Sequence, residues 1–160
     1  MASAFSIEIR GLAELIAKCN RSPSIVAEPI RQAFTKSALD LENKAKSLTP
    51  RVTGNLQRSI THRIGGGMPP TFAEVGLLGG GPVSKTGARY GVYVHEGTRP
   101  HVIVARRAKA LHFNGRFARR VRHPGTAANP FLRNALQAMS GAIQANFTAA
   151  AKAIEAAWGR

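Results

Sequence analysis

The fold of this chain is decided by one long amphipathic stretch, Pro29-Ile-Arg-Gln-Ala-Phe-Thr-Lys-Ser-Ala-Leu-Asp-Leu-Glu-Asn-Lys-Ala-Lys-Ser-Leu48. Its apolar residues recur at spacings of four and three, which places them along one stripe of an α-helix. They are Ile30, Phe34, Ala38, Leu41, Ala45 and Leu48. Because proline is tolerated only in the first turn, the helix is predicted to begin at Ile25 or Pro29. It ends at Leu48, since the residue before Pro50 avoids the α conformation.

A second long helix is predicted at the other end of the chain, with Asn129 as its N-cap and Pro130 as its first helical residue. Its apolar stripe consists of Leu132, Leu136, Met139, Ile143, Phe147, Ile154 and Trp158. The remaining positions on that face are mostly alanine, which permits close packing. The first half of the stripe is assigned to the domain core. A stripe this long could serve the core or a contact between subunits.

Four segments between these helices are predicted to be strands, because glycine runs separate short stretches of strand-like residues. They are residues 56–64, 72–78, 90–96 and 101–105, and a short strand and a short helix are expected at 4–10 and 12–16. Flexible glycine-rich loops are expected at 65–70 and 79–88, the second one becoming ordered on assembly. Strands in sequential order favour antiparallel pairing. The prediction is a single α+β domain over residues 1–160, a small antiparallel meander packed against the long N-terminal and C-terminal helices.

The charge of the chain predicts an anionic partner. There are 23 Lys and Arg residues against 8 Asp and Glu, a formal net charge of +15. Nucleic acid is the first candidate, an acidic protein surface the second and a membrane surface the third. No apolar stretch is long enough to span a bilayer and no signal peptide is recognised, so contact with a membrane is not expected. The single cysteine, Cys19, permits a reducing compartment, and a soluble cytosolic product is expected.

The basic charge is concentrated in an acid-free stretch from Gly97 to Ile154. The residues predicted to contact DNA or an acidic partner ring are Arg106, Arg107, Lys109, Arg116, Arg119, Arg120 and Arg122. Leu111, Phe113 and Phe117 alternate with these charges and are expected to anchor the segment to the sheet. The alternative interpretation is a basic loop that only keeps the protein soluble.

No catalytic, cofactor-binding or metal-ligating residue is predicted, and the chain is not expected to be an enzyme. Residues 79–86 nearly spell a phosphate-binding loop, but Ser84 replaces its second glycine and Pro82 removes an N–H donor. A strand is also expected to follow, where that motif requires a helix. The five histidines lack the spacing of zinc ligands, and no carboxylate pairs with a nucleophile. No helix-turn-helix or aromatic RNA-binding strand is present, which leaves charge-based contact with phosphates.

Several short motifs, in order from about Ala33 to Met139, resemble the tail-completion or head–tail joining (neck) proteins of long-tailed bacteriophages. They are Val52-Thr-Gly-Asn-Leu-Gln-Arg-Ser-Ile60, Tyr90-Gly-Val-Tyr-Val-His-Glu-Gly-Thr98, Arg99-Pro-His-Val-Ile-Val104, Ala110-Leu-His-Phe113, Val121-Arg-His-Pro-Gly-Thr126 and Asn129-Pro-Phe-Leu-Arg133. The structural motif positions are Thr53, Gly54, Leu56, Ser59, Tyr93, Glu96, Gly97, Thr98, Pro100, His101, His123, Pro124, Gly125, Pro130, Phe131 and Leu132. Gly97 and Gly125 are expected to turn the chain with positive φ. The loop at 79–87 and the alanine-rich tail beyond Ala142 depart from the family pattern.

The resemblance implies a structural virion protein that forms a ring, commonly a hexamer, at the head–tail junction. Such a ring would complete the tail and join it to the head around the DNA channel. Its partners would be head-side adaptor or stopper proteins, the tail terminator or tail tube protein, and DNA without base readout. It would be assembled in the bacterial host cytoplasm. The alternatives are a tail terminator ring that caps the tail tube and, in a different class, a non-specific basic nucleic-acid-binding protein.

Overall fold

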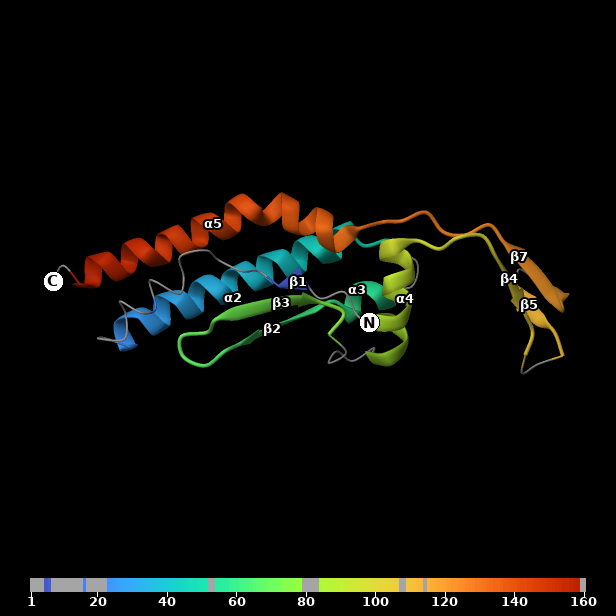
Figure 1. The fold of residues 1–160 in the computed structure, drawn as a ribbon, viewed down its shortest axis with the longest axis horizontal. Coiled ribbons are helices and arrows are strands. Elements are labelled where there is room, and N and C mark those ends of the chain that lie inside the picture. Colours follow the sequence, from blue (N-terminus) through green and yellow to red (C-terminus); the bar gives the residue numbers. More distant parts are fainter. Residues whose placement is uncertain are drawn as a thin grey trace.

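The computed structural model describes residues 5–6, 16, 23–51, 54–78, 84–106, 109–113 and 115–158. Figure 1 shows an elongated body, in which two long helices lie side by side along the long axis, and a narrow arm at the end opposite the C-terminus. The helices are α2 (Pro23–Leu48) and α5 (Phe131–Trp158). A small antiparallel sheet packs against α2, so the predicted α+β class is confirmed. None of the helices in these ranges combines the length and hydropathy needed to cross a membrane.

The predicted stripe of α2 forms the centre of the core. Ile30 and Phe34 are each 1% exposed, and Ala38 and Ala45 are fully buried. The helix ends at Leu48 as expected, but it begins at Pro23 rather than at Ile25 or Pro29. Proline suits a first helical position, which explains the start, and Pro29 is accommodated inside the helix.

Helix α5 runs beside α2 along almost the whole length of α2 and packs against its apolar stripe (Figure 1). The ring of Phe147 meets the ring of Phe34 edge-on, with 4.9 Å between centroids. Asn146 Nδ2 donates a hydrogen bond of 3.1 Å to Ser37 Oγ, which is buried. Ile154, near the end of the helix, is 1% exposed. One face of the alanine-rich half therefore also serves the core, through Ile143, Ala150 and Ile154, while most of its other residues are exposed, including Trp158 in the last turn.

The sheet contains β1 (Phe5–Ser6), β2 (Thr61–Gly65) and β3 (Phe72–Gly76), in the antiparallel order β1-β3-β2. Ala73 and Val75 of β3 are buried in the core that α2 and α5 share. Residues 66–71 connect β2 to β3, with Gly66 and Gly67 at positive φ. The predicted strand at 72–78 and its antiparallel pairing with the preceding strand are thus confirmed, although the strand ends at Gly76.

The structure corrects the remaining strand predictions. Residues 56–64 divide into helix α3 (Asn55–Ser59) and strand β2. The predicted strand at 90–96 lies in helix α4 (Ser84–Glu96), which also takes in residues 84–88 of the predicted loop; residues 79–83 lie outside the described ranges. The fourth predicted strand is β4 (His101–Val104), but it does not join the sheet, so there is no four-stranded meander in the described part of the chain.

The α4 error has a packing explanation. Tyr and Val favour strands, but such preferences yield to tertiary contacts. Gly91 faces Leu77 and Leu56 so closely that a Cβ atom there would lie 2.1 Å and 2.8 Å from their Cδ1 atoms. Gly91, Val94 and His95 are buried at helical spacing, while Tyr90 and Tyr93 are exposed. Helix α4 therefore buries the face that carries Gly91, where the absence of a side chain lets the helix backbone lie close to Leu56 and Leu77.

Candidate nucleic-acid interface

The arm, residues 98–126, is one long antiparallel hairpin. Strand β4 pairs with β7 (Arg120–His123), and β5 (Leu111–Phe113) pairs with β6 (Arg116–Ala118). The two ladders are linked by a hydrogen bond of 3.1 Å from Ala105 N to Arg119 O. Gly115, at φ +74°, lies in the turn at the tip. The arm projects away from the body in Figure 1.

The base of the arm is held by a clasp of backbone contacts between Thr98 and Thr126. Each residue donates its N–H to the carbonyl oxygen of the other, at 2.9 Å and 3.1 Å. Gly97 (φ +75°) precedes the first strand and Gly125 (φ +93°) ends the second, so the prediction of positive φ at both is confirmed. A Cβ atom on Gly125 would lie 2.3 Å from the carbonyl oxygen of Thr98. No larger residue fits this clasp without moving the arm.

The register of β4 and β7 gives the arm two chemically different faces, because residues directly opposite each other share a face and neighbours alternate. His101 lies opposite His123 and Ile103 opposite Val121, whereas Val102 lies opposite Arg122 and Val104 opposite Arg120. We name these the His face (His101, Ile103, Val121 and His123) and the Arg face (Val102, Val104, Arg120 and Arg122). All four residues of the Arg face are exposed.

On the His face, the imidazole rings of His101 and His123 form a pair. The rings of His101 and His123 lie 5.0 Å apart between centroids, tilted by 30°. Gly125 N donates to Nδ1 of His123 at 3.1 Å, so that nitrogen carries no proton. Nδ1 of His101 lies 2.9 Å from the carbonyl oxygen of Arg99, which requires the imidazole to be the donor. These bonds tie both rings to the base of the arm.

At the tip, Phe117 is 75% exposed and lies opposite His112, with 4.7 Å between the ring centroids. The expectation that Phe117 anchors this segment to the sheet is wrong, because the arm is separate from that sheet and offers no core at this point. Leu111 is half-buried, and the side chain of Phe113 lies outside what the structure describes.

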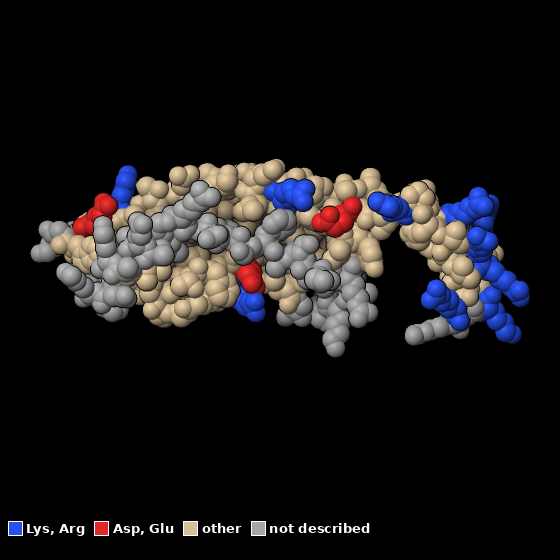
Figure 2. Space-filling model, in the orientation of Figure 1, with Lys and Arg blue, Asp and Glu red and all other residues tan. Residues whose placement is uncertain are grey.

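Figure 2 shows Lys and Arg side chains gathered over the arm and sparse over the rest of this face. The structure describes six of the seven predicted contact residues, and all six are exposed. The seventh, Arg107, lies outside the described residues. The six are Arg106, Lys109, Arg116, Arg119, Arg120 and Arg122. Among the described residues, no ion pair involves any of them.

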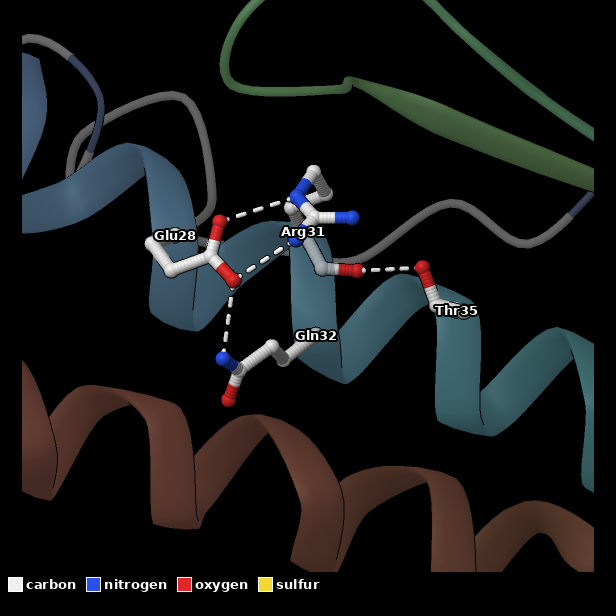
Figure 3. Close-up of polar contacts among 4 residues, drawn as sticks. All are labelled: Glu28, Arg31, Gln32 and Thr35. Carbon is white, nitrogen blue, oxygen red and sulfur yellow. Dashed lines mark hydrogen bonds and ion pairs between the residues drawn. The ribbon is translucent and has the colours of Figure 1, made fainter.

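Three acidic residues of the body, Glu28, Glu42 and Glu74, are by contrast already engaged in ion pairs. Glu28 on α2 accepts hydrogen bonds from Arg31 at 2.9 Å and 2.7 Å and from Gln32 at 2.8 Å, and Thr35 Oγ1 donates to Arg31 O (Figure 3). The bonds from Arg31 and Gln32 lower the pKa of Glu28. Glu74 pairs with Arg63 across β2 and β3 at 2.5 Å.

Ten of the sixteen motif residues lie at two places. Gly97, Thr98, Pro100, His101, His123, Pro124 and Gly125 surround the base of the arm, and Pro130, Phe131 and Leu132 lie at the start of α5. Gly54, Leu56 and Ser59 are buried at α3, Tyr93 and Glu96 are exposed on α4, and Thr53 lies outside the described residues.

His95 is a residue that sequence reasoning missed. Of the surface and hydrogen-bonded positions expected for the histidines it occupies a hydrogen-bonded one, but it is also buried, at 4% exposed. Its ring meets that of Phe131 edge-on at 5.3 Å, and its Nδ1 lies 2.8 Å from Glu96 Oε1. The helical spacing of Gly91, Val94 and His95 was the signal that could have shown it. This packing joins α4 to the start of α5, where the returning arm re-enters the body.

Two observations bear on the chemistry considered earlier. No cluster of three or more His, Cys, Asp or Glu residues that could hold a metal ion occurs within the described ranges. A helix, not a strand, follows Lys85, so one of the three arguments against a phosphate-binding loop is wrong. The arguments from Pro82 and Ser84 stand.

Comparisons with protein-family models, with curated proteins and with solved structures find no match to this chain.

Proposed function

We propose that this chain is a structural virion protein that forms a ring at the head–tail junction of a tailed phage. The ring completes the tail and joins it to the head around the DNA channel. It is commonly a hexamer in the family that the motifs resemble, and it acts without catalysis, cofactor or metal.

One observation carries the proposal. The motif residues around Gly97 and those around Gly125 are far apart in the sequence, yet they meet in the clasp that aims the arm away from the body. A shared set of motifs that fixes the direction of a projecting basic arm suits a subunit whose partners lie outside its own fold. Among the described residues β2 is an edge strand of the sheet, and its outer edge and the loops of the sheet supply the contacts between neighbouring subunits.

The neighbours of the ring follow from its position. A head-side adaptor or stopper protein contacts one face, and a tail terminator or tail tube protein contacts the other. A tail terminator ring is the closest alternative, and it differs only in its place in the virion. The high net charge also favours a non-specific nucleic-acid-binding protein, which would act as a monomer.

Light scattering at several concentrations, with and without the neck partners, tests the ring, together with negative-stain images of the same samples. Rings with a central hole are expected. A strict monomer in every condition would contradict the proposal, and tight DNA binding by that monomer would favour the nucleic-acid-binding alternative.

A further inference from the structure

We infer that the arm is a β-ribbon that binds the phosphate backbone of duplex DNA through its Arg face, without reading the bases. The inference rests on the proposed function for the place where the arm meets DNA, the channel of the ring. Its structural argument comes from the arm itself.

The arm requires a partner. A two-stranded hairpin is at best marginally stable alone in water. Four apolar side chains on the two faces and at the tip remain exposed, by 41%, 37%, 52% and 75% in the order Val102, Ile103, Val104 and Phe117. Covering the Arg face would bury two of these side chains and hold the two strands together.

That partner is not a second copy of this chain. The arm holds eight of the 23 basic residues and none of the eight acidic ones, so the rest of the chain keeps 15 basic residues against 8 acidic ones. Both parts are therefore positive and repel each other. The carboxylates of Glu28, Glu42 and Glu74 are already paired within their own subunit.

The composition of the arm favours a partner with paired oxyanion acceptors, such as the phosphates of DNA. Seven of its eight basic residues are Arg, whereas the rest of the chain has nine Arg and six Lys. A guanidinium binds phosphate through two parallel hydrogen bonds, which an ammonium cannot do. Because no described basic side chain of the arm has an internal ion pair, these donors are available.

The geometry of the Arg face also matches a duplex. Arg120 and Arg122 are two residues apart on one strand, which separates them by roughly 6.6 Å. Successive phosphates of one DNA strand rise by about 3.4 Å along the helix axis but also wind around it, so they lie farther apart in space than this rise, and the two side chains can reach neighbouring phosphates. A two-stranded ribbon is also narrow enough for the major groove. Val102 and Val104 would pack against the sugars of the backbone and not against base edges.

The test compares two double variants that lose the same charge. Arg120→Ser/Arg122→Ser removes the arginines of the Arg face, and Arg51→Ser/Lys152→Ser removes two exposed basic residues from the body. Fluorescence anisotropy with a 30-base-pair duplex measures the dissociation constant over a range of salt concentrations. The arm variant should bind about tenfold more weakly or worse, and the slope of log K against log salt should fall by about 2. The body variant should change affinity less than about threefold.

Three results would overturn the inference. Equal losses of DNA affinity in both variants would mean that binding depends on net charge alone and not on the Arg face. Tighter binding to a single strand of the same length would exclude the duplex, and equal competition by polyglutamate would favour an acidic protein partner. Circular dichroism of each variant checks that the fold is intact, and Arg120→Lys/Arg122→Lys, with intermediate affinity expected, tests the guanidinium without changing charge.

Light scattering on the same samples separates the two proposals. Rings that do not bind the duplex would refute this inference and leave the proposed ring standing. Binding by a protein that never forms rings would do the reverse.

Discussion

Single residues in this protein show how local electrostatics and backbone geometry hold the body and the arm. Glu42 of α2 is 13% exposed and is hydrogen-bonded to Lys46 on the same helix and to His62 on β2, the latter at 2.5 Å. Burial alone would raise the pKa of this carboxyl, but the bonds to Lys46 and His62 outweigh burial and lower the pKa. Glu42 therefore ties the helix to the sheet in its ionised form.

This assignment predicts a pH-dependent stability. Because the folded-state pKa lies below the unfolded one, the contribution of Glu42 is complete above the usual carboxyl range and is lost as the pH falls through the folded-state value. Glu42→Gln should lower the free energy of unfolding by about 1 kcal/mol at pH 7. Urea unfolding should show the difference from the native chain shrinking as the pH is lowered from 5 towards 2.

Glu155→Gln, at an exposed position of α5, is the matched control. It should change the free energy of unfolding by less than about 0.5 kcal/mol at every pH. If both variants show the same pH dependence, the effect does not come from the contacts of Glu42.

The clasp makes a second prediction at the scale of one residue. Gly125→Ala forces an L-residue to a positive φ, which costs about 1–2 kcal/mol. It also places a Cβ atom 2.3 Å from Thr98 O. Hydrogen exchange should show faster amides in residues 98–104 and 120–126 of the variant, because the base of the arm opens.

Gly67→Ala separates the two causes. Gly67 also has a positive φ, of +97°, but a Cβ atom there would meet nothing within 4 Å. Its cost should be the conformational term alone, with unchanged exchange in the arm. Unchanged arm amides in Gly125→Ala as well would mean that the clasp does not set the direction of the arm.

At the scale of elements, the contact between α2 and α5 carries the core. Phe34 is 1% exposed and packs edge-on against Phe147. Phe34→Ala should lower the free energy of unfolding by about 3–5 kcal/mol, since the large cavity cannot be refilled. Leu39→Ala, on the same helix but 43% exposed, is the control. Denaturant unfolding should give it a loss of less than about 1 kcal/mol, and similar losses in both variants would contradict the packing.

The elements also show which parts of the fold could be predicted from the sequence. The stripes of α2 and α5 were predicted because many residues repeat one spacing. Helix α4 was missed because Tyr and Val favour strands, and only contacts with Leu56 and Leu77, distant in sequence, decide otherwise.

The candidate site was predicted in composition but not in shape. The basic residues were found from charge alone, and their expected attachment to the sheet through Phe117 was wrong. A usable signal was present. Asn114-Gly115 between alternating residues is a strong hairpin signature, and it would have predicted the tip of the arm. The two faces could not be predicted, since they depend on the register between β4 and β7.

At the scale of the whole molecule, basic side chains are densest on the arm, at one end of the elongated molecule (Figure 2). Replacing Arg116, Arg119 and Arg120 by Ser should leave thermal unfolding unchanged, because exposed charges contribute little to stability. In a phage that depends on this protein, the variant should reduce virion assembly or DNA retention at the neck. Counting infectious particles and packaged DNA measures this.

Normal numbers of infectious particles would mean that these arginines only keep the protein soluble. A variant that fails to fold would mean that they are structural. Substituting Arg51, Arg58 and Arg133 instead, which are exposed on the body, removes the same charge and should leave assembly unaffected.

The open outer edges of the arm have a consequence for the free subunit. The unpaired backbone groups of a long, exposed, partly apolar hairpin can pair with a strand of another chain. Such edges normally favour aggregation. Here the arm as a whole carries eight basic residues and no acidic one, so two arms that approach each other in solution repel each other. The same arginines that we assign to DNA binding would thus also reduce aggregation of the free subunits through electrostatic repulsion. If the arm binds DNA as we infer, they would keep the arms of free subunits apart from one another until DNA neutralises them.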